Sequence, residues 1–171
     1  MKREIRSRIA DAGRRAGKLQ NVWKSKVYHL DTKVTLYYSL VVSVLLYGCE
    51  TWVVLKSDWH ALEAFHYRML SRMFRRQYDQ HIKTEDLLKS CNCRSLKIII
   101  AWRALKYWRK LQDGHNKAGN IVNSWTPKRK KQEGAQRKSW QDQISEHANT
   151  VNISLEELLK TDLKNWHKTQ P

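Results

Sequence analysis

The sequence is poor in residues that interrupt helices, with only two prolines and six glycines among 171 residues. Cysteine is also scarce. Three cysteines, an odd number, argue against a disulfide framework and indicate a reducing compartment. The N-terminal region lacks the apolar stretch of a secretory signal. We therefore expect an intracellular protein of the nucleus or cytoplasm.

Acidic residues are outnumbered two to one: the chain has 16 Asp and Glu against 33 Lys and Arg, a formal net charge of +17. A positive charge of this size attracts polyanions. Nucleic acid is the first candidate partner and an anionic membrane surface the second. Hydrophobic residues still make up 41% of the chain and include eight tryptophans, which is enough for a core and excludes wholesale disorder.

The longest hydrophobic run covers residues 34–49 and contains no charged residue. A membrane-spanning helix needs about 20 apolar residues, so the length predicts a buried helix and no stable membrane insertion. Asp31 is placed to cap the start of this helix, and Gly48 can end it in a left-handed conformation. Because the helix is apolar on every side, we expect neighbouring helices to cover it all round.

Apolar residues at three- and four-residue spacing predict these neighbouring helices. One helix contains the stripe that begins at Ile5, and a second starts near Ser57. A short helix begins at Thr84 as its cap, and Ser95 caps a long helix that ends before Gly114. No segment alternates as a strand would, so the sequence predicts an all-α fold.

The last third of the chain differs in character, because a polar, strongly basic stretch precedes two further helices. We predict one helix at 136–148 and another after Ser154, which has the capping-box spacing to Glu157. The expected organisation is a helical bundle at 1–114, a basic flexible linker at 115–135 and a C-terminal helical segment at 136–171.

Two consecutive runs, DTKVTLYYSLVVSVLLYGCETW at 31–52 and KSDWHALEAFHYRMLSRMFR at 56–75, carry a family resemblance. They are similar to a segment downstream of the polymerase core in non-LTR (LINE-type) retrotransposon reverse transcriptases. KYWRKLQDGH at 106–115 and GAQRKSW at 134–140 resemble, more loosely, later runs of that family. The matching residues of the first two runs are Lys33, Leu36, Tyr37, Leu40, Val41, Ser43, Leu45, Leu46, Tyr47, Gly48, Glu50, Thr51, Trp52, Leu62, Glu63, Phe65, Arg68, Leu70, Arg72 and Met73.

The resemblance implies the thumb and C-terminal segment of such an enzyme, a helical bundle that grips the template–product duplex by its backbone and carries no catalytic group. The family holds its two Mg²⁺ ions with carboxylates on a Y-x-D-D hairpin. In this chain Tyr78 and Asp79 are followed by Gln80, and no Asp–Asp pair occurs. We therefore expect a truncated retrotransposon reading frame that is not an enzyme and needs no cofactor.

Basic clusters are the candidate nucleic-acid contacts, because lysine and arginine neutralise phosphates without regard to base sequence. The alternative is a set of solvated helix faces. The stretch from Arg94 to Lys110 favours the first interpretation, since it holds six basic residues and no acidic one. The candidate contacts are Arg14, Arg15, Lys18, Arg72, Arg75, Arg76, Arg103, Lys106, Arg109, Lys110, Lys128, Arg129, Lys130 and Lys131.

Aromatic residues can stack on unpaired bases, although at helical spacing they more often form the core. Three tryptophans fit the core: Trp52, Trp59 and Trp102. Trp125 and Trp140, in the basic region, are the better candidates for stacking.

Cysteines and histidines offer a metal site as an alternative to free thiols. Cys91 and Cys93, with His81 or His115, are potential zinc ligands, but the C-x-C spacing is tighter than usual and a second ligand pair is missing. Free, partly buried thiols are the favoured interpretation. Cys49 belongs to the apolar run and is expected in the core.

Two other classes of function compete with nucleic-acid binding. A helical bundle without a polymerase palm can leave an apolar face uncovered, which would make it a protein–protein interaction or assembly module that self-associates. Its basic amphipathic helices can also bind an anionic membrane surface peripherally.

Overall fold

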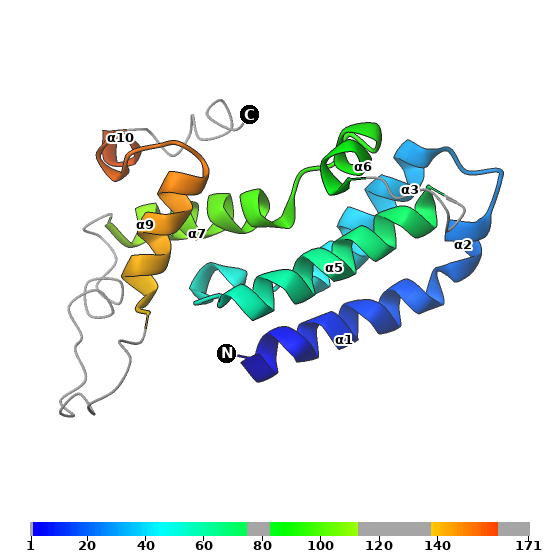
Figure 1. Ribbon diagram of the computed structural model, residues 1–171, viewed down its shortest axis with the longest axis horizontal. Helices are drawn as coiled ribbons and strands as arrows, with labels where there is room; N and C mark the ends of the chain where they lie inside the picture. The colour runs from blue at the N-terminus through cyan, green and yellow to red at the C-terminus, as the bar shows by residue number, and fades with distance from the viewer. Residues whose placement is uncertain (1, 75–82, 113–137, 161–171) are drawn as a thin grey trace. The chain divides into compact units, whose positions relative to one another are not determined.

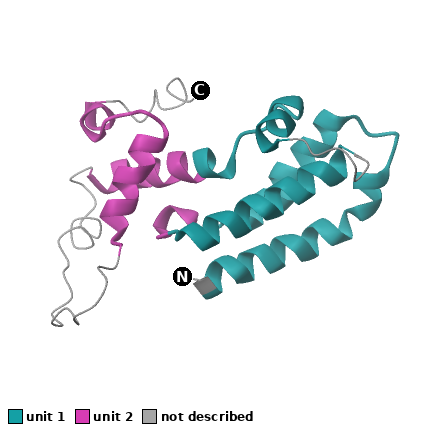
Figure 2. Cartoon of the chain, in the orientation of Figure 1, with its two compact units in different colours: residues 1–48, 54–99 teal, residues 49–53, 100–171 magenta. Residues whose placement is uncertain are grey.

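The computed structural model describes residues 2–74, 83–112 and 138–160. These residues form helices and connecting turns, with no strand among them, which confirms the predicted all-α fold. None of the described helices is long and apolar enough to cross a membrane. Figure 2 shows two compact units: residues 1–48 with 54–99, and residues 49–53 with 100–171. α7 (Leu96–Gln112) begins in unit 1 and continues in unit 2. The predicted linker at 115–135 lies outside the described residues.

Unit 1 is built around a rod, the consecutive helices α3, η1 and α4, which corresponds to the hydrophobic run. Figure 1 shows α1 and α5 running in the same direction, with the rod running opposite to both. α1 packs against η1, α4 and α5. The helices of this unit are α1 (Lys2–Lys18), α2 (Gln20–Lys24), α3 (Leu30–Tyr37), η1 (Tyr38–Val42), α4 (Ser43–Leu45), α5 (Lys56–Met73) and α6 (Thr84–Ser90).

Small residues let α1 approach the rod closely. Ala12 and Ala16 of α1 are buried, as is Ile5, so the predicted stripe is the inner face of this helix. The rod contributes Val41 and Leu45 to the same core. Burial of such aliphatic side chains, at about 25 cal/mol per Å² of apolar surface, is the main stabilising contribution in unit 1.

The rod differs from the predicted helix in its start, its interior and its exposure. It begins at Leu30, so Asp31 lies in the first turn rather than at the cap. Its middle, η1, is a π-helix, and one face is exposed to solvent rather than covered all round. Three hydroxyl groups lie on the exposed face: Thr35 Oγ1, Ser39 Oγ and Ser43 Oγ each donate to the carbonyl four residues earlier, at 2.9, 2.7 and 2.6 Å. Such bonds from hydroxyl to backbone bend and loosen helices.

The other helix ends in unit 1 agree with the sequence at three predicted positions and differ at one. Gly48 has φ +73°, the left-handed conformation expected at the end of the rod. Ser95 Oγ accepts from the amide of Lys97 at 3.2 Å at the start of α7. α6, however, has Lys83 at its N-cap and no side-chain cap, so the predicted Thr84 cap is wrong. α5 begins at Lys56, in agreement with the predicted start near Ser57.

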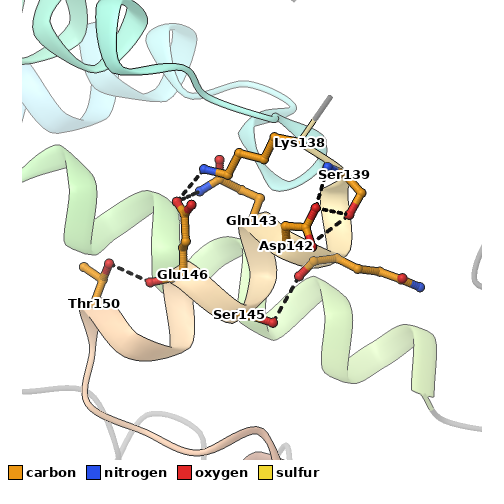
Figure 3. Close-up of polar contacts among 8 residues, drawn as sticks. Lys138, Ser139, Asp142, Gln143, Ser145, Glu146 and Thr150 are labelled. Carbon is orange, nitrogen blue, oxygen red and sulfur yellow. Dashed lines mark hydrogen bonds and ion pairs between the residues drawn. The ribbon is translucent and has the colours of Figure 1, made fainter. Parts of the chain in front are cut away.

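Unit 2 combines the short helix η2 (Cys49–Thr51) with the later part of α7, α9 (Trp140–Thr150) and α10 (Leu155–Lys160). α9 begins four residues later than predicted because Ser139 caps it. Figure 3 shows the reciprocal capping box: Ser139 Oγ accepts from the Asp142 amide at 3.1 Å, and the Ser139 amide donates to Asp142 Oδ2 at 2.8 Å. The predicted Ser154–Glu157 box is confirmed by two bonds of 3.1 Å. The buried side chains of unit 2 include Cys49, Trp52, Ile100, Trp102, Leu105, Leu111, Ile144, Ala148 and Leu158.

We expect Ser139→Ala to lower the free energy of unfolding of unit 2 by about 1 kcal/mol, because it removes the acceptor at the start of α9. Thermal unfolding followed by circular dichroism measures the change. Ser145→Ala is the matched control: this exposed serine donates only a long bond, 3.3 Å, to the Gln141 carbonyl (Figure 3). Equal melting temperatures for the two variants would contradict the role of the cap.

Candidate nucleic-acid interface

Among the described residues, most of the excess positive charge belongs to unit 1. The described residues of unit 1 contain 17 Lys and Arg against seven Asp and Glu, whereas those of unit 2 contain six against five. The excess is therefore +10 in unit 1 and +1 in unit 2 within the described parts. Among the described residues, a surface that attracts a polyanion by its charge therefore belongs first to unit 1.

α1 carries the densest part of this charge, with seven basic and two acidic residues. Three predicted contacts, Arg14, Arg15 and Lys18, are exposed in its last turns and form what we call the α1 basic cluster. Arg14 also pairs with Asp11, so its charge is partly compensated. The C-terminal end of a helix carries partial negative charge from its free carbonyls, and this charge stabilises cations placed there.

Arg72 is exposed in the last turn of α5. Because α1 and α5 run in the same direction, Arg72 and the α1 basic cluster lie toward the same end of unit 1 (Figure 1). Four cations predicted from separate sequence segments thus belong to one end of one unit. Arg75, Arg76, Lys128, Arg129, Lys130 and Lys131 lie outside the described residues.

The predicted contacts on α7 belong to unit 2, and two of them bond to the protein itself. Arg109 Nε donates to the Leu158 carbonyl at 3.1 Å and so ties α7 to α10. Arg103 is half-buried and faces Cys49, whose pKa burial raises to about 12 while Arg103 acts in the lowering direction. Lys110 is exposed and Lys106 half-buried. Of the predicted α7 residues, Lys110 has the most open side chain.

The tryptophans divide differently from the prediction. Trp52 and Trp102 are buried as expected, whereas Trp59 is only half-buried. Trp140, predicted to stack on bases, instead joins the fold of unit 2. Its Nε1 donates to the Glu50 carbonyl at 3.0 Å, and its ring meets Tyr107 edge-on at 6.2 Å between centroids. Trp125 lies outside the described residues.

Tyr47, a residue of the predicted apolar helix, is more exposed to solvent than Trp140. Tyr47 is 67% exposed, and the guanidinium of Arg8 lies 4.9 Å from the centre of its ring. Arg8 is in turn 3.8 Å from the Glu4 carboxylate. The neighbouring Gly48 is the sequence signal for this exposure. A residue next to a left-handed glycine lies at the end of the helix, where the apolar spacing no longer predicts which side chains are buried.

The cysteines behave as thiols of the protein interior. Cys49 and Cys91 are buried, and the half-buried Cys93 donates its thiol hydrogen to the Cys91 carbonyl at 3.3 Å. Burial raises the pKa of Cys93, which disfavours the thiolate that binds metals. Within the described ranges no group of three metal-ligating side chains occurs. His81 and His115, the suggested further ligands, lie outside those ranges.

A buried polar pair lies in the core of unit 1. Tyr37 Oη and His66 Nδ1 are 2.8 Å apart, and the two rings stack with centroids separated by 5.6 Å. Burial lowers the pKa of His66 from 6.5 to about 4, and the Arg94 carbonyl acts more weakly in the opposite direction. Burial also raises the pKa of Tyr37 well above its usual value, so this hydroxyl keeps its proton and can donate to the neutral ring.

The comparisons with known proteins return no match: no family model, no curated protein and no solved structure is similar to this chain.

Proposed function

We propose that this chain binds RNA or DNA through the phosphate backbone, without sequence specificity and without a polymerase active site of its own. The observation that supports the proposal most is the charge of unit 1, +10 within its described residues, together with the exposed α1 basic cluster. The resemblance of residues 31–75 to the thumb of non-LTR reverse transcriptases points to the same class of ligand, and no catalytic role is proposed.

Counterion release supplies the binding free energy in this mechanism. Each lysine or arginine that neutralises a phosphate frees a condensed cation into solution, so affinity falls as salt rises. The four cations at one end of unit 1 are Arg14, Arg15, Lys18 and Arg72. If each contacts one phosphate, raising the salt from 50 to 200 mM weakens duplex binding about a hundredfold.

The test compares two triple variants that remove the same charge. We expect Arg14→Gln/Arg15→Gln/Lys18→Gln to weaken binding to a labelled duplex about a hundredfold at physiological salt, with a salt slope smaller by about three. Lys56→Gln/Lys89→Gln/Lys97→Gln is the control, because these three lysines are also exposed in unit 1. Fluorescence anisotropy at several salt concentrations measures both quantities.

Equal losses in the two triple variants would show that net charge alone attracts nucleic acid, and would contradict the α1 basic cluster as the contact. Failure of the unchanged protein to bind duplex or single strand at low salt would overturn the proposed function.

A second candidate, an assembly module, is favoured by exposed aliphatic residues in unit 1. Leu40 in the exposed face of the rod and Leu55 before α5 are 39% and 49% exposed. Burial of such residues between copies would stabilise an oligomer that is insensitive to salt. Multi-angle light scattering separates the candidates, since a salt-insensitive oligomer that ignores nucleic acid supports only this one.

A further inference from the structure

Tyr47 is held in place by the backbone while its side chain stays in solvent. The two residues before it, Leu45 and Leu46, are fully buried, and the Tyr47 amide donates to the Val44 carbonyl at 3.4 Å. Gly48 follows with φ +73° and turns the chain away. The ring therefore projects from a fixed turn, which lowers the entropy cost of using it to bind a partner.

Arg8 of α1 orients the Tyr47 ring and links it to the basic face of the helix. Its guanidinium lies over the ring at 4.9 Å, a cation–π contact, and yet 67% of the tyrosine surface remains accessible. Arg15 follows Arg8 by seven residues, two helical turns, so both side chains project from one side of α1 about 10 Å apart. Arg8 and Arg15 thus place positive charge on one side of α1, between Tyr47 and the end of the α1 basic cluster.

We propose that Tyr47 stacks on an unpaired base of a single-stranded nucleic acid whose phosphates lie along α1. This inference rests on the proposed function and adds a strand preference to it. The charge of the neighbouring helix identifies the occupant, because a strand of nucleic acid offers both a negative backbone and planar rings. In a duplex the bases are stacked on one another, so the tyrosine gains nothing from them.

The experiment compares Tyr47→Ala with the unchanged protein on three labelled ligands of equal length: an oligouridine, an abasic strand and a duplex. Stacking on an aromatic side chain is worth about a factor of ten in affinity per base. We expect the variant to lose about tenfold on oligouridine and to bind the abasic strand and the duplex unchanged. Tyr47→Phe, which keeps the ring, is expected to retain the affinity for oligouridine.

Tyr28→Ala is the matched control, because Tyr28 is also a tyrosine of unit 1, 48% exposed in the loop between α2 and α3. An equal loss in both alanine variants would overturn the assignment to Tyr47. So would oligouridine binding that is unchanged in Tyr47→Ala while the α1 triple variant weakens it, although the proposed function would then stand. Equal melting curves by circular dichroism establish that the variants are folded, and a protein that binds none of the three ligands refutes both proposals.

Discussion

Replacing Lys33 with methionine is expected to lower the free energy of unfolding of unit 1 by about 2 kcal/mol. Lys33 is a buried lysine, 4% exposed, in the first half of the rod. Its ammonium donates to the carbonyl of Trp23 at 3.1 Å and to that of Ser25 at 2.7 Å. Methionine matches the length of the side chain but leaves both carbonyls at the end of α2 without this donor.

The size of the Lys33 effect follows from two opposing contributions. A hydrogen bond from a charged donor stabilises by roughly 1.5–3 kcal/mol, and a buried carbonyl that loses its donor costs a similar amount. Removing the charge also relieves the desolvation of the ammonium, which offsets part of that loss. A net loss of stability remains because α2 has only five residues, and a helix this short is not stable without bonds to the rest of the fold.

Urea unfolding followed by circular dichroism measures the change, with Lys24→Met as the control. Lys24 is exposed in the last turn of α2, so its replacement removes the same charge near the same helix end without opening the core. Equal urea midpoints for the two variants would show that the bonds from Lys33 do not stabilise the end of α2.

Unit 1 is expected to lose about 3 kcal/mol of stability as the pH falls from 6.5 to 4, through His66 alone. The pKa of this residue is 6.5 in the unfolded chain and about 4 in the fold. Between these values the unfolded state binds one more proton than the folded state. The stability of unit 1 therefore falls by about 1.4 kcal/mol per pH unit in that interval. Below about pH 4 the folded state is protonated as well, so the loss levels off.

The double variant Tyr37→Phe/His66→Phe isolates this effect from the carboxylates that titrate over an overlapping range. It removes both members of the buried pair, so neither is left without its partner. The surrounding polar groups, Tyr38 and Cys93, keep their protons because burial raises the pKa of each. We expect the difference in unfolding free energy between the unchanged protein and the variant to shrink as pH falls from 7 to 4.5. A constant difference would show that His66 does not titrate on unfolding.

Local signals in the sequence predicted much of the fold. The Ser154–Glu157 spacing, the glycine at 48 and the apolar spacing around Ala12 each depend on residues within one or two turns, so a linear pattern contains them. The π-helix in the rod was not predictable in this way. A π-helix differs from an α-helix only in a hydrogen-bond span longer by one residue, and the apolar run with its serines is equally compatible with a regular α-helix.

The candidate site was predicted only in part, because charge in the sequence does not show what each charge contacts. Arg14, Arg15 and Lys18 are exposed as a contact with phosphate requires. Arg109 looked equivalent, but it bonds to a carbonyl 49 residues away. Lys33 looked like the edge of an apolar run, and its ammonium turned out to bond backbone carbonyls of the preceding helix and loop. These uses depend on tertiary packing.

The crowding of like charges in unit 1 has opposite consequences for folding and for binding. Repulsion among its cations disfavours the compact state, and dissolved ions relieve that repulsion by screening it. The same ions compete with a polyanion for the surface, so conditions that favour the folded chain weaken its complexes. A bound nucleic-acid strand would neutralise the cations of unit 1 in place of dissolved ions. Binding would therefore stabilise the folded state most at low salt concentration.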